Sequence, residues 1–383
     1  MKEGSTRMTI RPGERTSDTY RFFDHEFSVR SESEEFSSAF REIFGRFHLD
    51  GGKGKGAAYR VLRGKGPDEG FEVTSDGRSY AVEEGGDLPG FAYMKITDSA
   101  LSKVRSHYLF HAAALSSSDR GVILPAASKS GKTTLTLELV KRGFKFLSDD
   151  VSAVSKSDHK LYPFPKRLGL LPQTLELCPE AELDSLKMLP MIGGGQKKLL
   201  DIEDLYPGST GGPCELKYLV FLGPVMGTRR EGEEDLYIVV SGVTDSLISD
   251  IREIDGVMDA AILPHRKYPI IKIITDGKRH VHSRIEEVCA GNGVLLFDAS
   301  DGNEERPDFT ATPELKKIPK SAAAVELLKR IKGVTSAKLE SRGSMTGLFM
   351  EMGKVLSGVE CFYLTPGSLE ERAERLCELL GHK

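Results

Sequence analysis

Hydrophobic and polar residues recur along this chain in patterns that predict a mixture of strands and helices. The clearest pattern is an apolar strand at 121–125, a loop of small residues, and a helix over 133–141. In that helix a leucine stands at every second position from Leu135, which is not a single apolar stripe, so we expect burial on more than one side. Gly143 follows the helix and is a natural residue for its C-terminal end.

Residues 19–100 predict a small β-rich region. A strand-like segment at 19–28 and a helical segment at Phe36–Phe47 lead to a glycine-rich loop at 51–56. Three or four short strands are expected after that loop, at Ala58–Leu62, Phe71–Ser75, Ser79–Glu83 and Ala92–Ile96. The polar residues 1–18 at the start of the chain are expected to form a disordered tail.

An apolar strand at Tyr108–Leu115 precedes the central strand, and a turn at Ser116–Arg120 connects the two. We expect these strands to pair as a hairpin. Such a hairpin would bring His111 close to the loop that follows the central strand. A histidine in an apolar strand can equally be a satisfied core residue, so both interpretations stay open here.

The spacing of apolar residues changes between 231 and 302. Strands and helices there follow the order β-α-β-β-α-β, which is typical of a ferredoxin-like α+β module. Residues 301–308 form a polar linker, and 306–383 return to helical spacing around one strand at Glu360–Leu364. We therefore expect a core at 101–230, an inserted module at 231–302, and a C-terminal helical part of the same core at 306–383.

Length and composition limit the kinds of protein this can be. With 383 residues the chain has room for two or three domains, and its net charge of −4 gives no reason to expect a nucleic-acid partner. It contains neither an apolar run of about 20 residues that would span a membrane nor an N-terminal signal peptide, so we expect a cytoplasmic location. The five cysteines are scattered, which argues against a disulfide framework or a zinc site, and His280 and His282 diverge on a predicted helix.

The loop after the central strand carries the first candidate chemistry. A strand, a loop ending in Gly131-Lys132-Thr133 and a helix form the pattern of a loop that binds nucleotide phosphates, although Ala126 stands where glycine is usual. Lys132 would reach the β- and γ-phosphates, and the Thr133 hydroxyl would bind Mg²⁺. The expected contacts to the nucleotide in this loop are Ala127, Ser128, Lys129, Ser130, Gly131, Lys132, Thr133 and Thr134.

Two aspartates supply the second candidate chemistry. The apolar run of the strand after the central helix breaks at Asp149 and Asp150. One carboxylate would hold Mg²⁺, and the other would orient or deprotonate an attacking hydroxyl. We assign Asp150 to the metal together with Thr133. Both aspartates, His111 and Lys132 are the candidate catalytic residues, and which aspartate is the base stays open.

Together these residues resemble the kinase core of the HPr kinase/phosphorylase family. The likeness lies in His111, the loop 126–134, the helix end at Leu139–Gly143, and the double aspartate in Leu147–Asp150. The wider fold group includes phosphoenolpyruvate carboxykinase, and Lys129 departs from its loop pattern, which has glycine at that place. Beyond this segment the resemblance is diffuse.

The resemblance implies an α/β fold with a P-loop kinase core. It also implies transfer of the γ-phosphate of ATP, with Mg²⁺, to a serine-type hydroxyl of a protein or peptide. The family has a similar strand with proline and arginine after the double aspartate, so Lys166 and Arg167 are candidate contacts to phosphate or substrate. Relatives often self-associate, which makes a homo-oligomer a further expectation. In a glycine-rich loop, Lys197 or Lys198 could close over a phosphate.

Two other functions stay open. Ala126, Lys129 and the additional module motivate a nucleotide-responsive binding or regulatory protein without transfer activity. A carboxykinase-type enzyme acting on an oxo-acid is a third reading, but the chain lacks the second set of basic and metal-binding motifs that such enzymes use. ATP binding without hydrolysis or transfer would favour the binding protein.

Overall fold

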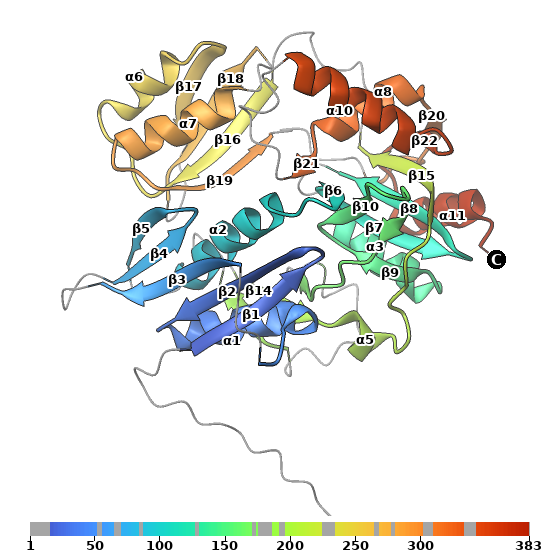
Figure 1. The fold of residues 1–383 in the computed structure, drawn as a ribbon. Helices are drawn as coiled ribbons and strands as arrows, with labels where there is room; N and C mark the ends of the chain where they lie inside the picture. The colour runs from blue at the N-terminus through green and yellow to red at the C-terminus, as the bar shows by residue number, and fades with distance from the viewer. Residues whose placement is uncertain are drawn as a thin grey trace, which may run out of the picture.

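The computed structural model describes residues 16–51, 56–64, 70–83, 87–126, 130–170, 174, 186–190, 196–223, 234–263, 268–276, 280–301, 309–332 and 342–382. Within them the chain is a mixed α/β protein built on several sheets (Figure 1). The expected tail lies mostly outside the described residues. The first strand nevertheless begins at Thr16, inside the segment 1–18 for which we expected disorder.

The N-terminal part forms a five-stranded sheet in the order β1-β2-β3-β4-β5. Its strands are β1 (Thr16–Phe22), β2 (His25–Ser31), β3 (Ala57–Arg63), β4 (Phe71–Ser75) and β5 (Arg78–Val82). Its helical segments are α1 (Glu34–Phe44), the 3-10 turn η1 (Gly45–Phe47) and α2 (Leu88–Ser102). Buried aromatic side chains such as Tyr20, Phe22 and Phe40 fill the space between sheet and helices.

The predicted strand at Ala92–Ile96 is wrong, because these residues belong to helix α2. Ala92, Ile96 and Ala100 follow one another at four-residue spacing, and all three are fully buried. A short apolar run fits a strand and a buried helix equally well. The burial of every fourth residue from Ala92 to Ala100 is typical of a helix and not of a strand.

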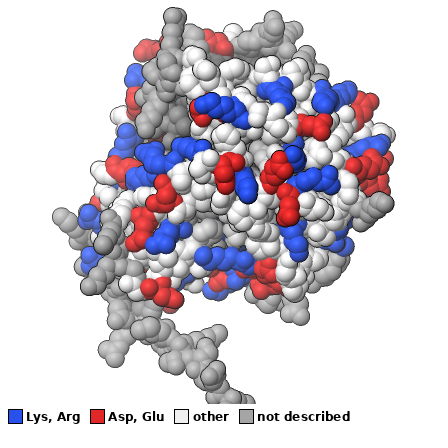
Figure 2. Space-filling model, turned by 45° about the vertical axis from the view of Figure 1, so that its right-hand side comes forward, with Lys and Arg blue, Asp and Glu red and all other residues white. Residues whose placement is uncertain are grey.

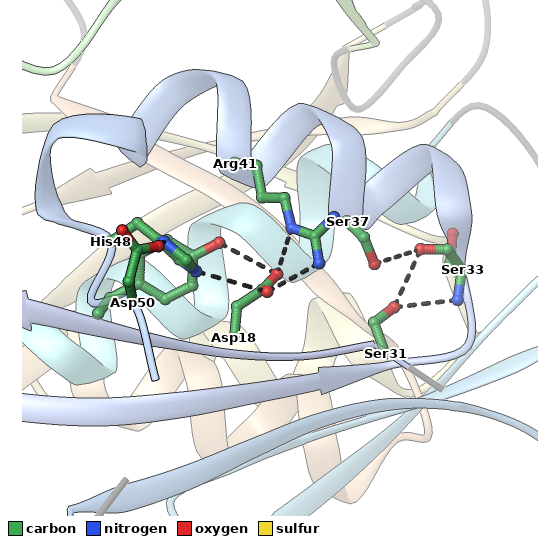
Figure 3. A network of polar contacts seen from close by, with 8 residues as sticks. Asp18, Ser31, Ser33, Ser37, Arg41, His48 and Asp50 are labelled. Carbon is green, nitrogen blue, oxygen red and sulfur yellow. Dashed lines mark hydrogen bonds and ion pairs between the residues drawn. The ribbon is translucent and has the colours of Figure 1, made fainter. Parts of the chain in front are cut away.

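A network of polar contacts ties α1 to the first strand (Figure 3). Both oxygens of Asp18 accept hydrogen bonds from Arg41, one from Nε at 2.6 Å and one from a terminal nitrogen at 2.7 Å. His48 Nε2 lies 3.6 Å from the same carboxylate. At the start of α1 the Ser33 hydroxyl accepts a hydrogen bond from the N–H of Phe36 and caps the helix. These contacts fix α1 against the sheet.

A six-stranded sheet contains the central strand, in the order β20-β22-β15-β8-β7-β9. Its strands are β7 (Ala112–Ser117), β8 (Arg120–Pro125), β9 (Lys145–Ser148), β15 (Glu215–Leu222), β20 (Leu315–Lys317) and β22 (Glu360–Leu364). β8 runs parallel to β15 and antiparallel to β7. The second of these pairings is the predicted hairpin, turned by Ser118 and Asp119 with positive φ.

Helices cover both faces of this sheet. They are α3 (Lys132–Lys141), α8 (Lys320–Leu328), α10 (Arg342–Val355) and α11 (Leu369–Leu380). On one face Leu124 packs in a buried cluster with Leu139 of α3 and Leu376 of α11. On the other, Ile123 packs in a cluster with Leu327 of α8. α3 contacts both the sheet and α11, which confirms its predicted burial on more than one side.

The predicted strand at Tyr108–Leu115 is divided at His111. The first half, β6 (His107–Phe110), belongs to a different four-stranded sheet, in the order β11-β10-β6-β21. The next predicted strand is divided in the same way at Asp149 and Asp150, between β9 and β10. Both breaks lie where the chain passes from one sheet to the other. The other strands of this sheet are β10 (Ser152–Ser155), β11 (Leu161–Tyr162) and β21 (Ile331–Lys332).

A small three-stranded sheet lies in the order β12-β14-β13. Its members are β12 (Leu168–Leu170), β13 (Met188–Pro190) and β14 (Gln196–Leu200), and the short helix α5 (Ile202–Leu205) follows β14. β14 pairs antiparallel with both neighbours, so its residues are held from two sides.

A separate four-stranded antiparallel sheet, in the order β17-β18-β16-β19, is formed by 234–301. Its elements are β16 (Glu234–Val240), α6 (Leu247–Arg252), β17 (Val257–Leu263), β18 (Ile270–Thr275), α7 (His280–Gly291) and β19 (Leu296–Asp301). They follow one another as β-α-β-β-α-β and share their own buried cluster. In Figure 1 this part lies beside α2, and Lys95 of α2 contacts Glu286 of α7 at 3.3 Å.

Candidate phosphate-binding site

The described part of the candidate phosphate loop ends at Ala126 and resumes at Ser130. Ala126 is buried and extends β8 by a bridge to Leu222. Gly131 has a φ of +79°, a left-handed conformation that glycine adopts without strain. The ten-residue helix α3 starts at the next residue, and its N-terminus attracts anions through free N–H groups and the helix dipole. The expected contacts at Ala127, Ser128 and Lys129 lie outside the described residues.

Thr133 connects the start of α3 to the acidic pair. Its hydroxyl donates a hydrogen bond of 2.9 Å to Oδ2 of Asp149. The other oxygen of Asp149, Oδ1, is buried and accepts no hydrogen bond from any described residue. A buried carboxylate oxygen without a donor costs on the order of 1–3 kcal/mol. This oxygen is therefore well suited to a cation.

His111 and Asp150 meet where β6 passes into β7 and β9 into β10. Nδ1 of His111 lies 2.9 Å from Oδ1 of Asp150, and the backbone N–H of His111 donates to the carbonyl of Arg330. Nζ of Lys166 lies 3.9 Å from the other oxygen of Asp150. The imidazole keeps 45% of its side chain exposed, so a substrate can approach this pair.

Lys166 is held within the same group of charges. Only 12% of its side chain is exposed. Burial by itself lowers the pKa of Lys166, but its contact with Tyr93 and the charges of Asp150 and Asp149 outweigh burial and raise that pKa. The ammonium group of Lys166 therefore stays charged beside the two aspartates.

Lys197 brings a further cation from β14. A Cβ on Gly169 of β12 would lie 2.9 Å from Cδ of Lys197, so the glycine leaves room for this side chain. Burial, then the charges of Lys166 and Lys132, lower the pKa of Lys197, while both aspartates raise it. These three lysines outnumber the two aspartates by one. That balance favours an anionic ligand.

Arg167 lies apart from this group. Its guanidinium pairs with Glu42 of α1 at 3.0 Å and with Asp204 of α5 at 3.6 Å. Its backbone N–H donates to the carbonyl of Ile43. These contacts bind the segment before β12 to α1 and give no support to the nucleotide contact that we predicted for Arg167.

The candidates named from the sequence do not include Arg372, which also touches the loop. A terminal nitrogen of its guanidinium donates a hydrogen bond of 3.3 Å to the carbonyl of Ser130. A signal for it exists in the sequence, because Leu369, Arg372, Leu376 and Leu380 follow helical spacing. An arginine on the apolar face of a helix is unusual, so this pattern identifies Arg372 as a candidate functional residue.

Other kinds of site find little support in the described residues. No three or more His, Cys, Asp or Glu side chains are grouped there so as to hold a metal ion. The described helices include none that is long and apolar enough to cross a membrane. On the face shown in Figure 2, basic and acidic side chains are interspersed, without the broad basic surface that nucleic acids bind.

Comparison with known proteins adds little to this geometry. No family model and no curated protein matches the chain. Among solved structures, the Hpr(Ser) kinase/phosphatase from Coxiella burnetii is similar over 48% of this chain and 90% of that chain, at 15% sequence identity and a TM-score of 0.20. A likeness at this TM-score establishes neither fold nor function. What the site does must therefore be inferred from its own contacts.

Proposed function

We propose that this chain is an ATP-dependent kinase that transfers the γ-phosphate to a serine-type hydroxyl of a protein or peptide. The main support is the hydrogen bond between Thr133 and Asp149, because it joins a phosphate-loop sequence to an acidic pair. Asp150, the residue after Asp149, contacts His111. A hydroxyl that met the γ-phosphate there would also meet a group able to take its proton.

Mg²⁺ is the cofactor that this site fits. Asp149 supplies a buried oxygen that no described residue satisfies, Thr133 supplies a hydroxyl, and Mg²⁺ prefers such oxygen ligands. We expected Asp150 to share the metal with Thr133. In the proposal Asp149 takes that role, since it is the carboxylate that Thr133 contacts. When bound, the ion would neutralise charge on the β- and γ-phosphates.

The chain's own residues divide the remaining tasks. The N–H groups at the start of α3 and the ammonium group of Lys132 would hold the phosphates. Lys166 and Lys197 would add positive charge near the transferred group. The pair of His111 and Asp150 would accept the proton of the acceptor hydroxyl as its oxygen bonds to the γ-phosphorus and ADP leaves.

We also propose how the domains divide. Residues 101–230 and 306–383 would form a P-loop kinase core, and 231–302 a ferredoxin-like module inserted into it. The β-α-β-β-α-β order and the strand order β17-β18-β16-β19 support the second assignment. Such a module would offer a surface to an acceptor protein or a small effector.

Transfer from γ-labelled ATP to a library of serine-containing peptides, with Mg²⁺ present, tests the proposal. The unaltered chain should label one or more peptides. Lys132→Ala and the double variant Asp149→Ala/Asp150→Ala should keep the native circular dichroism spectrum and transfer no label. Full activity in either variant would contradict the proposal. ATP binding without hydrolysis or transfer would favour the nucleotide-responsive binding protein.

A further inference from the structure

Arg372 is a buried cation between α11 and the end of the phosphate loop. Only 3% of its surface is exposed. Besides its hydrogen bond to the Ser130 carbonyl, a terminal guanidinium nitrogen lies 3.4 Å from the place that a Cβ of Gly131 would take. The guanidinium therefore touches both residues that end the loop.

No carboxylate among the described residues pairs with this guanidinium, and its Nε is buried without a hydrogen-bond partner. Burial lowers the pKa of Arg372 to about 10. The surroundings are apolar, because the ring of Phe309 also lies 3.7 Å from that Gly131 position, and the next residue, Ala373, is in the buried cluster. A buried charge without a counter-charge is costly, so such residues are rare unless a partner is present.

Arg375 on the same helix shows the ordinary behaviour of an arginine. It lies one turn further along, keeps 46% of its side chain exposed and pairs with Glu378 at 3.2 Å. Arg372 differs in both respects. The position of Arg372 beside a helix N-terminus that attracts anions explains why it is buried without a counter-charge, since a bound anion would supply the negative charge.

We propose that Arg372 is a positioning residue for an anion in the phosphate loop, namely the polyphosphate chain of a nucleoside triphosphate. This inference rests on the proposed function. The carbonyl of Ser130 and the N–H of Gly131 belong to one planar trans peptide and point to opposite sides. By holding that carbonyl on its own side, Arg372 turns the N–H of Gly131 toward the ligand. Its charge also attracts the ligand through the loop.

A purely structural role of Arg372 predicts a different melting temperature for Arg372→Met than the positioning role does. If Arg372 only braced the loop, Arg372→Met would lose a hydrogen bond and the melting temperature without ligand would fall. In the proposed role the same hydrogen bond is lost, but its loss is offset because the ligand-free protein no longer carries an uncompensated buried charge. Methionine has a similar length and removes that charge, so the melting temperature should stay the same or rise.

The experiment measures calorimetric affinities of the full chain for ATP, inorganic pyrophosphate and tripolyphosphate, and melting temperatures without ligand. Hydrogen bonds to charged groups contribute enough that Arg372→Met should weaken tripolyphosphate binding by about 10- to 100-fold. The loss should be smaller for the less charged pyrophosphate. Arg372→Lys should recover part of the affinity. The matched control Arg375→Met, on the same helix, should leave affinity and melting temperature unchanged.

The outcomes separate this inference from the proposed function. If the unaltered chain binds tripolyphosphate and Arg372→Met binds it equally well, the positioning role is overturned and the proposed function stands. Weaker binding together with a lower melting temperature would assign Arg372 a structural role and also overturn the inference. If the unaltered chain binds neither tripolyphosphate nor ATP, both proposals fail.

Discussion

Nδ1 of His111 lies 2.9 Å from Oδ1 of Asp150, at the level where two sheets exchange strands. The chain leaves the sheet that contains β6 just before His111, and it returns to the same sheet in β10, just after Asp150. The contact therefore brings together two breaks that lie far apart in the chain.

The first prediction concerns His111. His111→Asn should lower transfer from ATP by about 100-fold or more, because loss of a general acid–base group typically costs that much. The affinity for ATP should change little, since the proposal places the imidazole on the acceptor side of the site. Steady-state kinetics with the labelled peptide and calorimetry with ATP measure the two effects.

His159→Asn is a matched control for this change. His159 has a positive φ of 55° in a turn away from the acidic pair, a conformation that asparagine tolerates. This variant should keep full transfer activity. Equal activity of His111→Asn and His159→Asn would remove His111 from the mechanism.

The second prediction concerns the unsatisfied oxygen of Asp149. Asp149→Asn can still accept the hydrogen bond from Thr133 through its amide oxygen, but it lacks the negative charge that a cation needs. We expect Mg²⁺ with ATP to raise the melting temperature of the unaltered chain much more than that of Asp149→Asn. Without ligand the variant should be no less stable, because the buried charge is gone.

Thermal unfolding with and without Mg²⁺ and ATP checks this prediction. Asp50→Asn serves as the control, because the Asp50 side chain is fully exposed. An Asp149→Asn protein that is stabilised by Mg²⁺ and ATP as strongly as the control would show that Asp149 does not hold the ion.

The third prediction concerns Gly131. Gly131→Ala forces a Cβ into a left-handed residue and places it 3.4 Å from Arg372, so it should lower the free energy of unfolding by about 1–2 kcal/mol. Binding of tripolyphosphate should be weakened as well. Chemical denaturation and calorimetry measure the two quantities.

Gly347→Ala gives the opposite expectation within the same chain. Gly347 lies in helix α10, and an added Cβ meets nothing within 4 Å. Alanine should therefore stabilise the protein by about 0.5–1 kcal/mol. If Gly131→Ala were as stable as Gly347→Ala, the left-handed conformation at the loop would be contradicted.

The fourth prediction is a pH dependence at Asp24. Its carboxylate accepts hydrogen bonds from the N–H groups of Arg105 and Ser106, each at 3.2 Å, and from the Ser106 hydroxyl at 2.6 Å. Burial alone raises the pKa of Asp24, but these donors outweigh it and lower the pKa. The resulting stability is present above the unfolded pKa, about 3.9, and is lost as pH falls through the lower folded pKa.

Asp24→Asn should therefore cost about 0.5–1 kcal/mol at pH 7, a small value because the side chain is exposed. At about pH 3 the difference from the unaltered chain should shrink, as the native carboxylate begins to take up its proton. Urea unfolding at the two pH values measures it. A difference that is larger at the acid pH would contradict the sign of the shift.

Much of the architecture around the site was predictable from sequence periodicity. The hairpin of β7 and β8 and the burial of α3 follow from apolar runs with clear turn and helix signals. The break at Asp149 and Asp150 was predicted, because the apolar run ends there, whereas the strand expected at Tyr108–Leu115 ran through His111 without a break. That these breaks mark a change of sheet was not visible, because strand pairing partners are set by distant parts of the chain.

The finer contacts of the site depended on packing between elements far apart in sequence. Which aspartate meets Thr133 depends on where the chain leaves β9, and neighbouring residues there point in different directions. Arg167 pairs with Glu42 because α1 packs beside it, and the sequence around Arg167 does not show that α1 lies there. Arg372 reaches the loop only because α11 packs against α3.

The central claim is that the loop before α3 and the aspartates after β9 form one site for phosphoryl transfer. Its most direct test compares ATP affinity and γ-phosphate transfer in the unaltered chain, Lys132→Ala and Asp150→Asn. We predict that Lys132→Ala loses both ATP binding and transfer, whereas Asp150→Asn keeps ATP binding and loses transfer by at least about 100-fold. Undiminished transfer in Asp150→Asn, or undiminished ATP binding in Lys132→Ala, would contradict the claim.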